Sequence, residues 1–131
     1  MSTWGMGTFE DDDARDWLND LQEHDTAFLE KTLRTPLPNY LSAPDGQVLL
    51  AAAEVVAAMK GAPAEDFPDD MEDWLKSQHV GIAAQLAPLA IDCLKRVAGN
   101  QSELHELWKE NADEYADWQE YMRDLHFRLK H

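Results

Sequence analysis

The sequence contains one cysteine, no long hydrophobic run and few basic residues, and each shortage excludes a class of protein. Because Cys93 has no second cysteine to pair with, no internal disulfide can form, which is typical of a reducing compartment. The longest apolar stretches, residues 48–59 and 80–91, contain polar residues and are too short to span a bilayer. The first residues lack a basic region followed by an apolar stretch, so no secretory signal is predicted. We therefore expect a cytoplasmic protein.

Basic residues are outnumbered throughout: 11 Lys and Arg stand against 26 Asp and Glu, a net charge of −15. A field of this sign repels phosphate backbones and anionic lipids, which argues against direct binding to nucleic acid or membranes. Residues 1–74 hold 17 acidic and 4 basic side chains, a net charge of −13, whereas residues 75–131 carry only −2. The anionic character is concentrated in the first half, where it fits a basic partner protein or serves solubility alone.

Motifs for catalysis or cofactor binding are absent. The pair Gly5 and Gly7 belongs to neither the GxGxxG nor the GxxxxGK[ST] phosphate pattern. The histidines form neither HExxH nor ExxH, the spacings of zinc and di-iron sites; they are His24, His79, His105, His126 and His131. We predict no catalytic residue, no metal ligand and no cofactor from the sequence.

Helical periodicity dominates the chain, and no alternating strand pattern is present. The hydrophobic content of 44% and the five tryptophans predict a packed core. We predict an all-α, single-domain protein over residues 1–131, with an N-terminal Trp-Gly-x-Gly-x-Phe arm over 1–11 and a bundle of five to six helices over 12–131. The expected helical segments are about 12–34, 47–60, 71–78, 80–98, 102–110 and 112–130.

Several of these boundaries have identifiable signals. An aspartate among residues 11–13 can cap the first helix, and its neighbours suit the positive end of the helix dipole. Pro88 lies within the segment 80–98 and is expected to kink or break it, since proline lacks a donor and clashes with the preceding turn. Asn100 and Asn111 each precede a glutamate at capping-box spacing, so both are candidate helix caps.

The N-terminal arm is expected to be structural. Gly5 and Gly7 permit unusual backbone dihedrals or close contacts, so that Trp4 and Phe9 can pack over the bundle. The flanking acidic residues would repel a phosphate, which argues against a phosphate-binding loop. We predict a clasp formed by Trp4 and Phe9.

Two acidic clusters, the second beside Trp74, form the candidate interaction surface. Three consecutive aspartates point in different directions around a helix, so capping and solvation explain the first cluster better than a Ca²⁺ or Mg²⁺ site. An acidic patch that includes an aromatic residue is a plausible docking surface for a basic protein, although a solvated linker is the more common explanation of such a run of charges. The candidate residues are Asp11, Asp12, Asp13, Asp69, Asp70, Glu72 and Asp73.

Three segments resemble a known family. They are the opening residues 4–17, which read WGMGTFEDDDARDW, the alanine-rich residues 49–58, and residues 100–108, which read NQSELHELW. Together they resemble the bacterial domain of unknown function 4259 family over nearly the whole chain. The resemblance implies a small, cytoplasmic, largely helical bacterial protein, and it carries over no catalytic or binding residue.

Three functions stay open at this point. The first is a non-catalytic protein–protein interaction module, such as an immunity-type inhibitor that covers the cationic active site of a nuclease. The second is a metal-dependent or hydrolytic enzyme whose carboxylates and histidines meet from separate helices. The third is a DNA-mimic inhibitor with acids spaced regularly along one face. We favour the first, because clustered acids fit a basic protein partner; the oligomeric state is not indicated.

Overall fold

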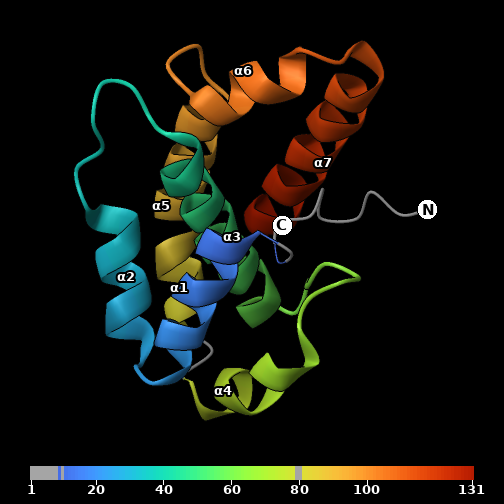
Figure 1. The fold of residues 1–131 in the computed structure, drawn as a ribbon. Helices are drawn as coiled ribbons and strands as arrows, with labels where there is room; N and C mark the ends of the chain where they lie inside the picture. Colours follow the sequence, from blue (N-terminus) through green and yellow to red (C-terminus); the bar gives the residue numbers. More distant parts are fainter. Residues whose placement is uncertain (1–8, 10, 79–80) are drawn as a thin grey trace.

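The computed structural model describes residues 9, 11–78 and 81–131, and this part of the chain forms seven α-helices (Figure 1). The predicted all-α class is confirmed, and the predicted count of five to six helices is corrected to seven. In the described residues, extended pairing is limited to an isolated bridge between Leu41 and Ser102. The helices are α1 (Asp12–Gln22), α2 (Thr26–Arg34), α3 (Ala43–Met59), α4 (Glu72–Ser77), α5 (Gly81–Val97), α6 (Glu103–Lys109) and α7 (Ala112–Lys130), with a 3₁₀ turn, η2 (Asp69–Met71), before α4.

The additional helix arises from a break in the first predicted helix. Helix α1 ends at Gln22, and Asp25 begins α2 by accepting a hydrogen bond from the backbone N–H of Ala27 at 3.0 Å. The apolar residues Leu21 and Leu29 lie on either side of the break and are both fully buried. Because the hydrophobic spacing continues across the break, periodicity alone predicts one helix where there are two.

Helix α3 is the centre of the bundle and packs against α1, α2, α5, α6 and α7. Every side chain from Leu49 to Ala58 is buried, because alanine at many positions lets the surrounding helices approach closely. The helix begins earlier than the predicted residue 47, since Ser42 caps it through the N–H of Asp45. Its end is as predicted: Gly61 has a φ of 90°, a left-handed conformation that glycine adopts without strain.

Helix α5 continues from Gly81 to Val97 through Pro88, so no break occurs there. Pro88 is exposed, and so is Ala84. Because proline has no backbone N–H, the carbonyl of Ala84 lacks the hydrogen-bond donor that residue 88 of a helix normally supplies. Water can bond that carbonyl on the exposed side, which explains why the helix tolerates the residue.

Helices α6 and α4 lie at opposite ends of the bundle (Figure 1). Ser102, rather than the predicted Asn100, caps α6 by accepting from the N–H of His105. The carboxylate of Glu103 instead accepts from the N–H of Ala43 at 2.8 Å, so it caps α3 from across the fold. The prediction of Asn111 as the cap of α7 is confirmed.

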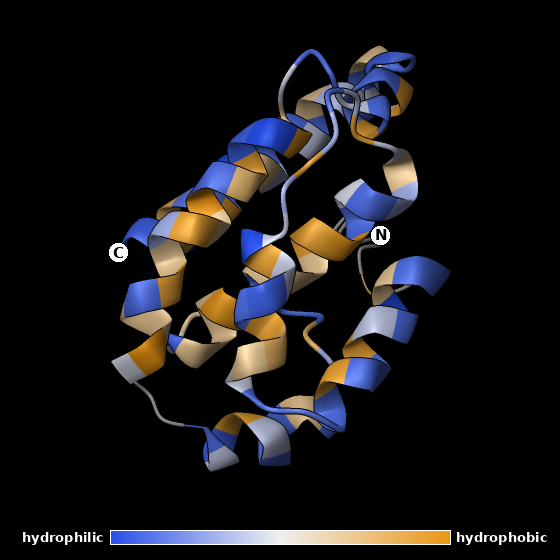
Figure 2. Cartoon of the chain, turned by 90° about the vertical axis from the view of Figure 1, so that its left-hand side faces the viewer, coloured by the Kyte–Doolittle hydropathy of each residue, from blue (hydrophilic) through white to orange (hydrophobic). Residues whose placement is uncertain are grey.

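Figure 2 shows hydrophobic and hydrophilic residues alternating along the outer helices, the pattern of helices that bury one face and expose the other. Phe9 packs against the core and meets the ring of Phe67 edge-on, with centroids 5.4 Å apart. This is one part of the predicted clasp, whereas Trp4, Gly5 and Gly7 lie outside the described residues. Within the described part of the chain, the helices are all too short or too polar to cross a membrane.

Candidate functional site

Residues 67–74 run alongside α1 in the same direction. Three contacts in succession define this arrangement, because they follow the same order along both segments. In order, they join Phe9 to Phe67, Arg15 and Gln22 to Asp70, and the carbonyl of His24 to the indole N–H of Trp74. The acidic residues 69–73 therefore lie beside the first helix, although more than 50 residues of chain separate the two clusters.

The ion pair between Arg15 and Asp70 fastens the two segments together. The guanidinium Nη2 lies 2.5 Å from Asp70 Oδ2, and Gln22, two turns further along α1, donates to the same oxygen at 3.5 Å. The hydrogen bond from Arg15 lowers the pKa of Asp70 below its ordinary value, against a smaller opposing effect of burial. Both side chains are partly solvated, so the pair contributes on the order of 0.2–1 kcal/mol to the free energy of unfolding. Its main effect is to hold Asp70 beside α1.

The three aspartates at the start of α1 have different roles. Asp11 is the helix cap, and its carboxylate accepts from the N–H of Ala14 at 3.0 Å, as predicted for one member of the cluster. Asp12 is exposed and lies one turn before Arg15, so the helical repeat places it on the same flank as Arg15, the partner of Asp70. Asp13 is also exposed, but at about 100° per residue it lies on the opposite flank from Arg15. The structure therefore separates Asp13 from the second cluster.

The members of the second cluster all reach solvent. Asp69 and Asp73 are exposed, and Glu72 forms an ion pair with Lys76 at 3.0 Å. The two basic side chains in this region, Arg15 and Lys76, are thus each paired with an acid. We define the acidic face as Asp11, Asp12, Asp69, Asp70, Glu72 and Asp73.

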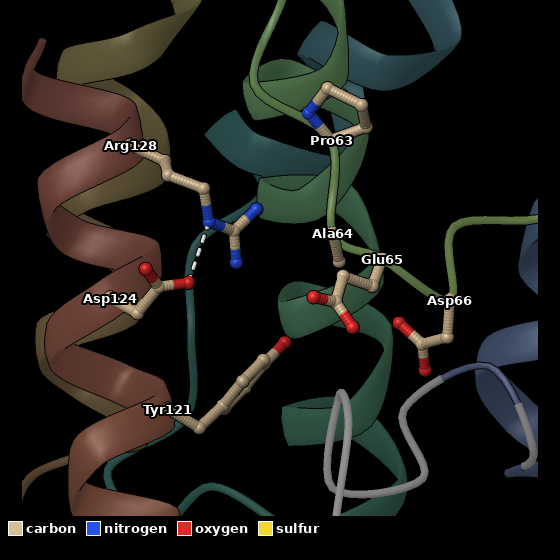
Figure 3. Close-up of a pocket in the computed structure, with 7 residues that line it drawn as sticks. All are labelled: Pro63, Ala64, Glu65, Asp66, Tyr121, Asp124 and Arg128. Carbon is tan, nitrogen blue, oxygen red and sulfur yellow. Dashed lines mark hydrogen bonds and ion pairs between the residues drawn. The ribbon is translucent and has the colours of Figure 1, made fainter. Parts of the chain in front are cut away.

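A pocket of about 330 Å³ lies between α7 and the loop that precedes the acidic face (Figure 3). Figure 3 shows side chains from α7 on one side and the loop on the other, with the Glu65 carboxylate between them. The lining residues are Pro63, Ala64, Glu65, Asp66, Tyr121, Asp124 and Arg128. A second pocket, of about 310 Å³, shares Pro63–Glu65 and extends to Asp69 and Glu72. The loop therefore connects the acids of α7 with the acidic face.

A buried charge cluster forms the wall of the first pocket. Glu54 of α3 is fully buried, and its Oε1 and Oε2 accept from Nη1 and Nη2 of Arg128 at 2.8 and 3.2 Å. Tyr121 donates to Glu54 Oε2 at 2.5 Å. Arg128 also donates to Asp124 Oδ2 at 2.8 Å and to the carbonyl of Ala62 at 3.1 Å. The guanidinium thus joins α3, α7 and the loop after α3.

The cluster holds α3, α7 and the loop after α3 in place, and its arginine does not exchange protons at neutral pH. Burial acts to lower the pKa of Arg128, but the hydrogen bonds and charges of Glu54 and Asp124 outweigh it and raise that pKa. The guanidinium therefore stays charged, and four of its five N–H groups are engaged with protein acceptors. Sequence reasoning missed this cluster. The available signal was Glu54 itself, a lone charge within the apolar residues 49–58.

Comparison with known proteins identifies the family. The profile of the domain of unknown function 4259 family (DUF4259) matches residues 2–121. The chain belongs to this family. The resemblance predicted from the three sequence segments is thus confirmed, while no curated protein and no solved structure matches. The DUF4259 match includes the acidic face and Glu54, and it ends at Tyr121, so Asp124 and Arg128 lie beyond it.

Two titratable residues outside these regions, Cys93 and His105, are held within the fold by packing or hydrogen bonds. Cys93 is buried in this DUF4259 chain, and burial together with the charge of Asp92 raises its pKa to about 11, so the thiol is protonated at neutral pH. His105 lies between the carbonyl of Gly99 and the hydroxyl of Tyr115, at 2.8 and 2.9 Å. In residues 9, 11–78 and 81–131, no three His, Cys, Asp or Glu side chains are placed to hold a metal ion; His79 lies outside this range.

Proposed function

We propose that this protein is a non-catalytic protein–protein interaction module that docks a basic partner through its acidic face. The observation that carries the proposal is the ordered series of contacts between residues 67–74 and residues 9–24, which brings carboxylates from two distant clusters near one another. Neither basic side chain on that surface is left to neutralise the remaining acids, because Arg15 and Lys76 are already paired. Such a surface accelerates association with a cationic protein and selects against anionic ones.

The two pockets that Pro63–Glu65 help to line support the same proposal. They supply recesses next to the carboxylates of Glu65, Asp69 and Glu72, where lysine or arginine side chains of a partner can insert. The buried pair of Glu54 and Arg128 fixes the wall of one recess, so the surface is preorganised for docking. An immunity-type inhibitor acting in the cytoplasm, where the acidic face covers the cationic active site of a nuclease, is the concrete form that we propose.

Charge reversal on the acidic face tests the proposal. The binding partners to test are the basic proteins encoded by genes next to this one, purified and titrated by calorimetry. We expect the variant D69K/D70K/E72K/D73K to raise the Kd by about tenfold or more, which corresponds to about 1.4 kcal/mol. The matched control, E110K/D113K/D117K/E120K, makes the same change in net charge at exposed acids near α6 and α7.

The two variants separate local docking from a general charge effect. Equal weakening by both shows that net charge alone attracts the partner, which contradicts a docking face. An unchanged Kd for the first variant contradicts the proposal as well. Circular dichroism and thermal unfolding of each variant confirm that the helical fold is retained.

A further inference from the structure

A shallow apolar groove lies between α5 and α7, away from the residues that define the acidic face. Ile91, Leu94 and Ala98 of α5 and Met122 of α7 form its apolar surface, and its volume is about 190 Å³. Phe127 of α7, just beyond the groove, exposes 61% of its surface. An exposed aromatic residue beside an apolar groove is typical of a surface that meets another molecule.

The charge around this groove is opposite to that of the protein as a whole. The polar side chains that line it are Lys95, Arg123 and His126, and no acid is among the lining residues. Lys130 follows His126 by one turn on the same flank of α7. Within residues 9, 11–78 and 81–131, neither Lys95 nor Lys130 forms an ion pair, and Arg123 has only a long contact of 3.7 Å with Glu120.

Helix α7 separates its charges between two flanks. The flank that faces the groove carries Arg123, His126 and Lys130. Asp117 and Asp124 lie on the other side, where Asp124 and its ion-pair partner Arg128 face the pocket beside loop 63–66. In a chain with a net charge of −15, this separation leaves a local basic surface with an apolar centre.

We propose that the groove between α5 and α7 binds an acidic amphipathic helix of a partner protein. The furrow between two packed helices accepts the side-chain ridge of a third helix, and apolar residues at i, i+3 and i+4 can enter it. Acidic residues beside that apolar stripe then face Lys95 and Arg123 across the rim. Complementary charge gives the contact its orientation.

Charge and volume argue against three other occupants. The groove is smaller than the roughly 300–1,000 Å³ of typical small-molecule sites. A symmetric dimer through this face places the same basic side chains opposite one another, which is repulsive. An anionic membrane is repelled by the net charge of −15. This inference is independent of the proposed function, since it concerns a different face and a partner of opposite charge.

A designed peptide provides the probe. It is a fluorescein-labelled helix of about 18 residues, long enough to form in water, with leucines on one stripe and glutamates beside it. A second peptide carries lysine in place of each glutamate. Fluorescence anisotropy measures the binding of both to the full-length protein, to K95E/R123E, and to the control K31E/K109E, which reverses two exposed lysines elsewhere.

We expect the acidic peptide to bind the wild-type protein, and K95E/R123E to weaken it by about tenfold or more while K31E/K109E does not. The proposal is overturned if the acidic peptide fails to bind, if the lysine peptide binds equally well at this groove, or if K95E/R123E has no effect. Sedimentation with vesicles of phosphatidylglycerol tests a membrane surface. Binding to those vesicles without binding to the peptide also overturns the proposal, as does self-association that K95E/R123E abolishes.

Discussion

Arg15 of α1 and Asp70 of η2 are 55 residues apart in the sequence, and their side chains meet at 2.5 Å. The contact places two acidic clusters on one side of the molecule. Taken separately, one cluster is a helix start and the other is a solvated turn. Trp74 fixes the same arrangement further along, because its indole N–H donates to the carbonyl of His24. The acidic face is thus a product of tertiary packing.

Replacing Asp70 by asparagine is expected to lower the free energy of unfolding by about 0.2–1 kcal/mol at pH 7, the range for solvated ion pairs. Because the pKa of Asp70 is lowered in the folded state, its contribution is fully present above the unfolded value of 3.8 and is lost progressively as the pH falls from there through the lower folded value. Urea unfolding of the wild type and D70N between pH 7 and pH 2.5 measures this. A difference that does not shrink between pH 4 and pH 2.5 contradicts the assignment.

Removing the charge of Glu54 is expected to destabilise the protein strongly. The variant E54Q leaves the Arg128 guanidinium, whose side chain is 12% exposed, without its bidentate carboxylate and with the exposed Asp124 as its remaining ion-pair partner. Breaking a buried pair in this way costs about 3–5 kcal/mol. The double variant E54L/R128M removes both charges, and it should recover much of the loss. Denaturant unfolding of both variants is the measurement. A double variant less stable than E54Q shows that the pair itself, rather than an uncompensated charge, supplies the stability.

The signals that sequence reasoning used correctly are local ones. Asp11 and Asn111 cap their helices, because each acts on backbone groups within a few residues. The break at residues 23–25 was missed, since the apolar spacing continues through it and the cap, Asp25, is one acid among many. Local patterns therefore determined the fold class and most helix ends, but not the number of helices.

The arrangement of the candidate site depends on contacts between distant residues. Glu54 and Arg128 are 74 positions apart, and neither residue type signals a partner on its own. The two acidic clusters were recognisable, but only the packing shows that Asp70 pairs with Arg15, on the flank of α1 that Asp12 shares and Asp13 does not. The basic groove was equally hidden, because Lys95 and Arg123 belong to different helices.

Because Asp11 caps α1 and Asp13 does not, the two residues are expected to differ in their effect on stability. We expect D11A to reduce stability by about 1 kcal/mol, because the N–H of Ala14 loses its acceptor. We expect D13A to cost less, since it removes only a charge near the helix dipole, about 0.3–1 kcal/mol. Thermal unfolding of both variants tests the order. If D13A is the more damaging of the two, the cap is assigned to the wrong aspartate.

Cys93 is expected to react slowly in the folded protein. Its pKa of about 11 keeps the thiol protonated below that value, and its side chain is buried. At pH 8, the reaction with 5,5′-dithiobis(2-nitrobenzoic acid) should be much slower in the native protein than in urea, where the thiol has an ordinary pKa and is exposed. Equal rates in the two conditions contradict the burial of this residue.

The most direct test of the acidic docking face is the salt dependence of the association rate with the basic partner, measured by stopped flow for the wild type and D69K/D70K/E72K/D73K. Steering by exposed charges is screened by salt, since the Debye length falls from about 30 Å at 0.01 M to about 8 Å at 0.15 M. The account predicts a rate that falls steeply with salt for the wild type, and a slower, nearly salt-independent rate for the variant. The same salt dependence in both proteins would contradict it.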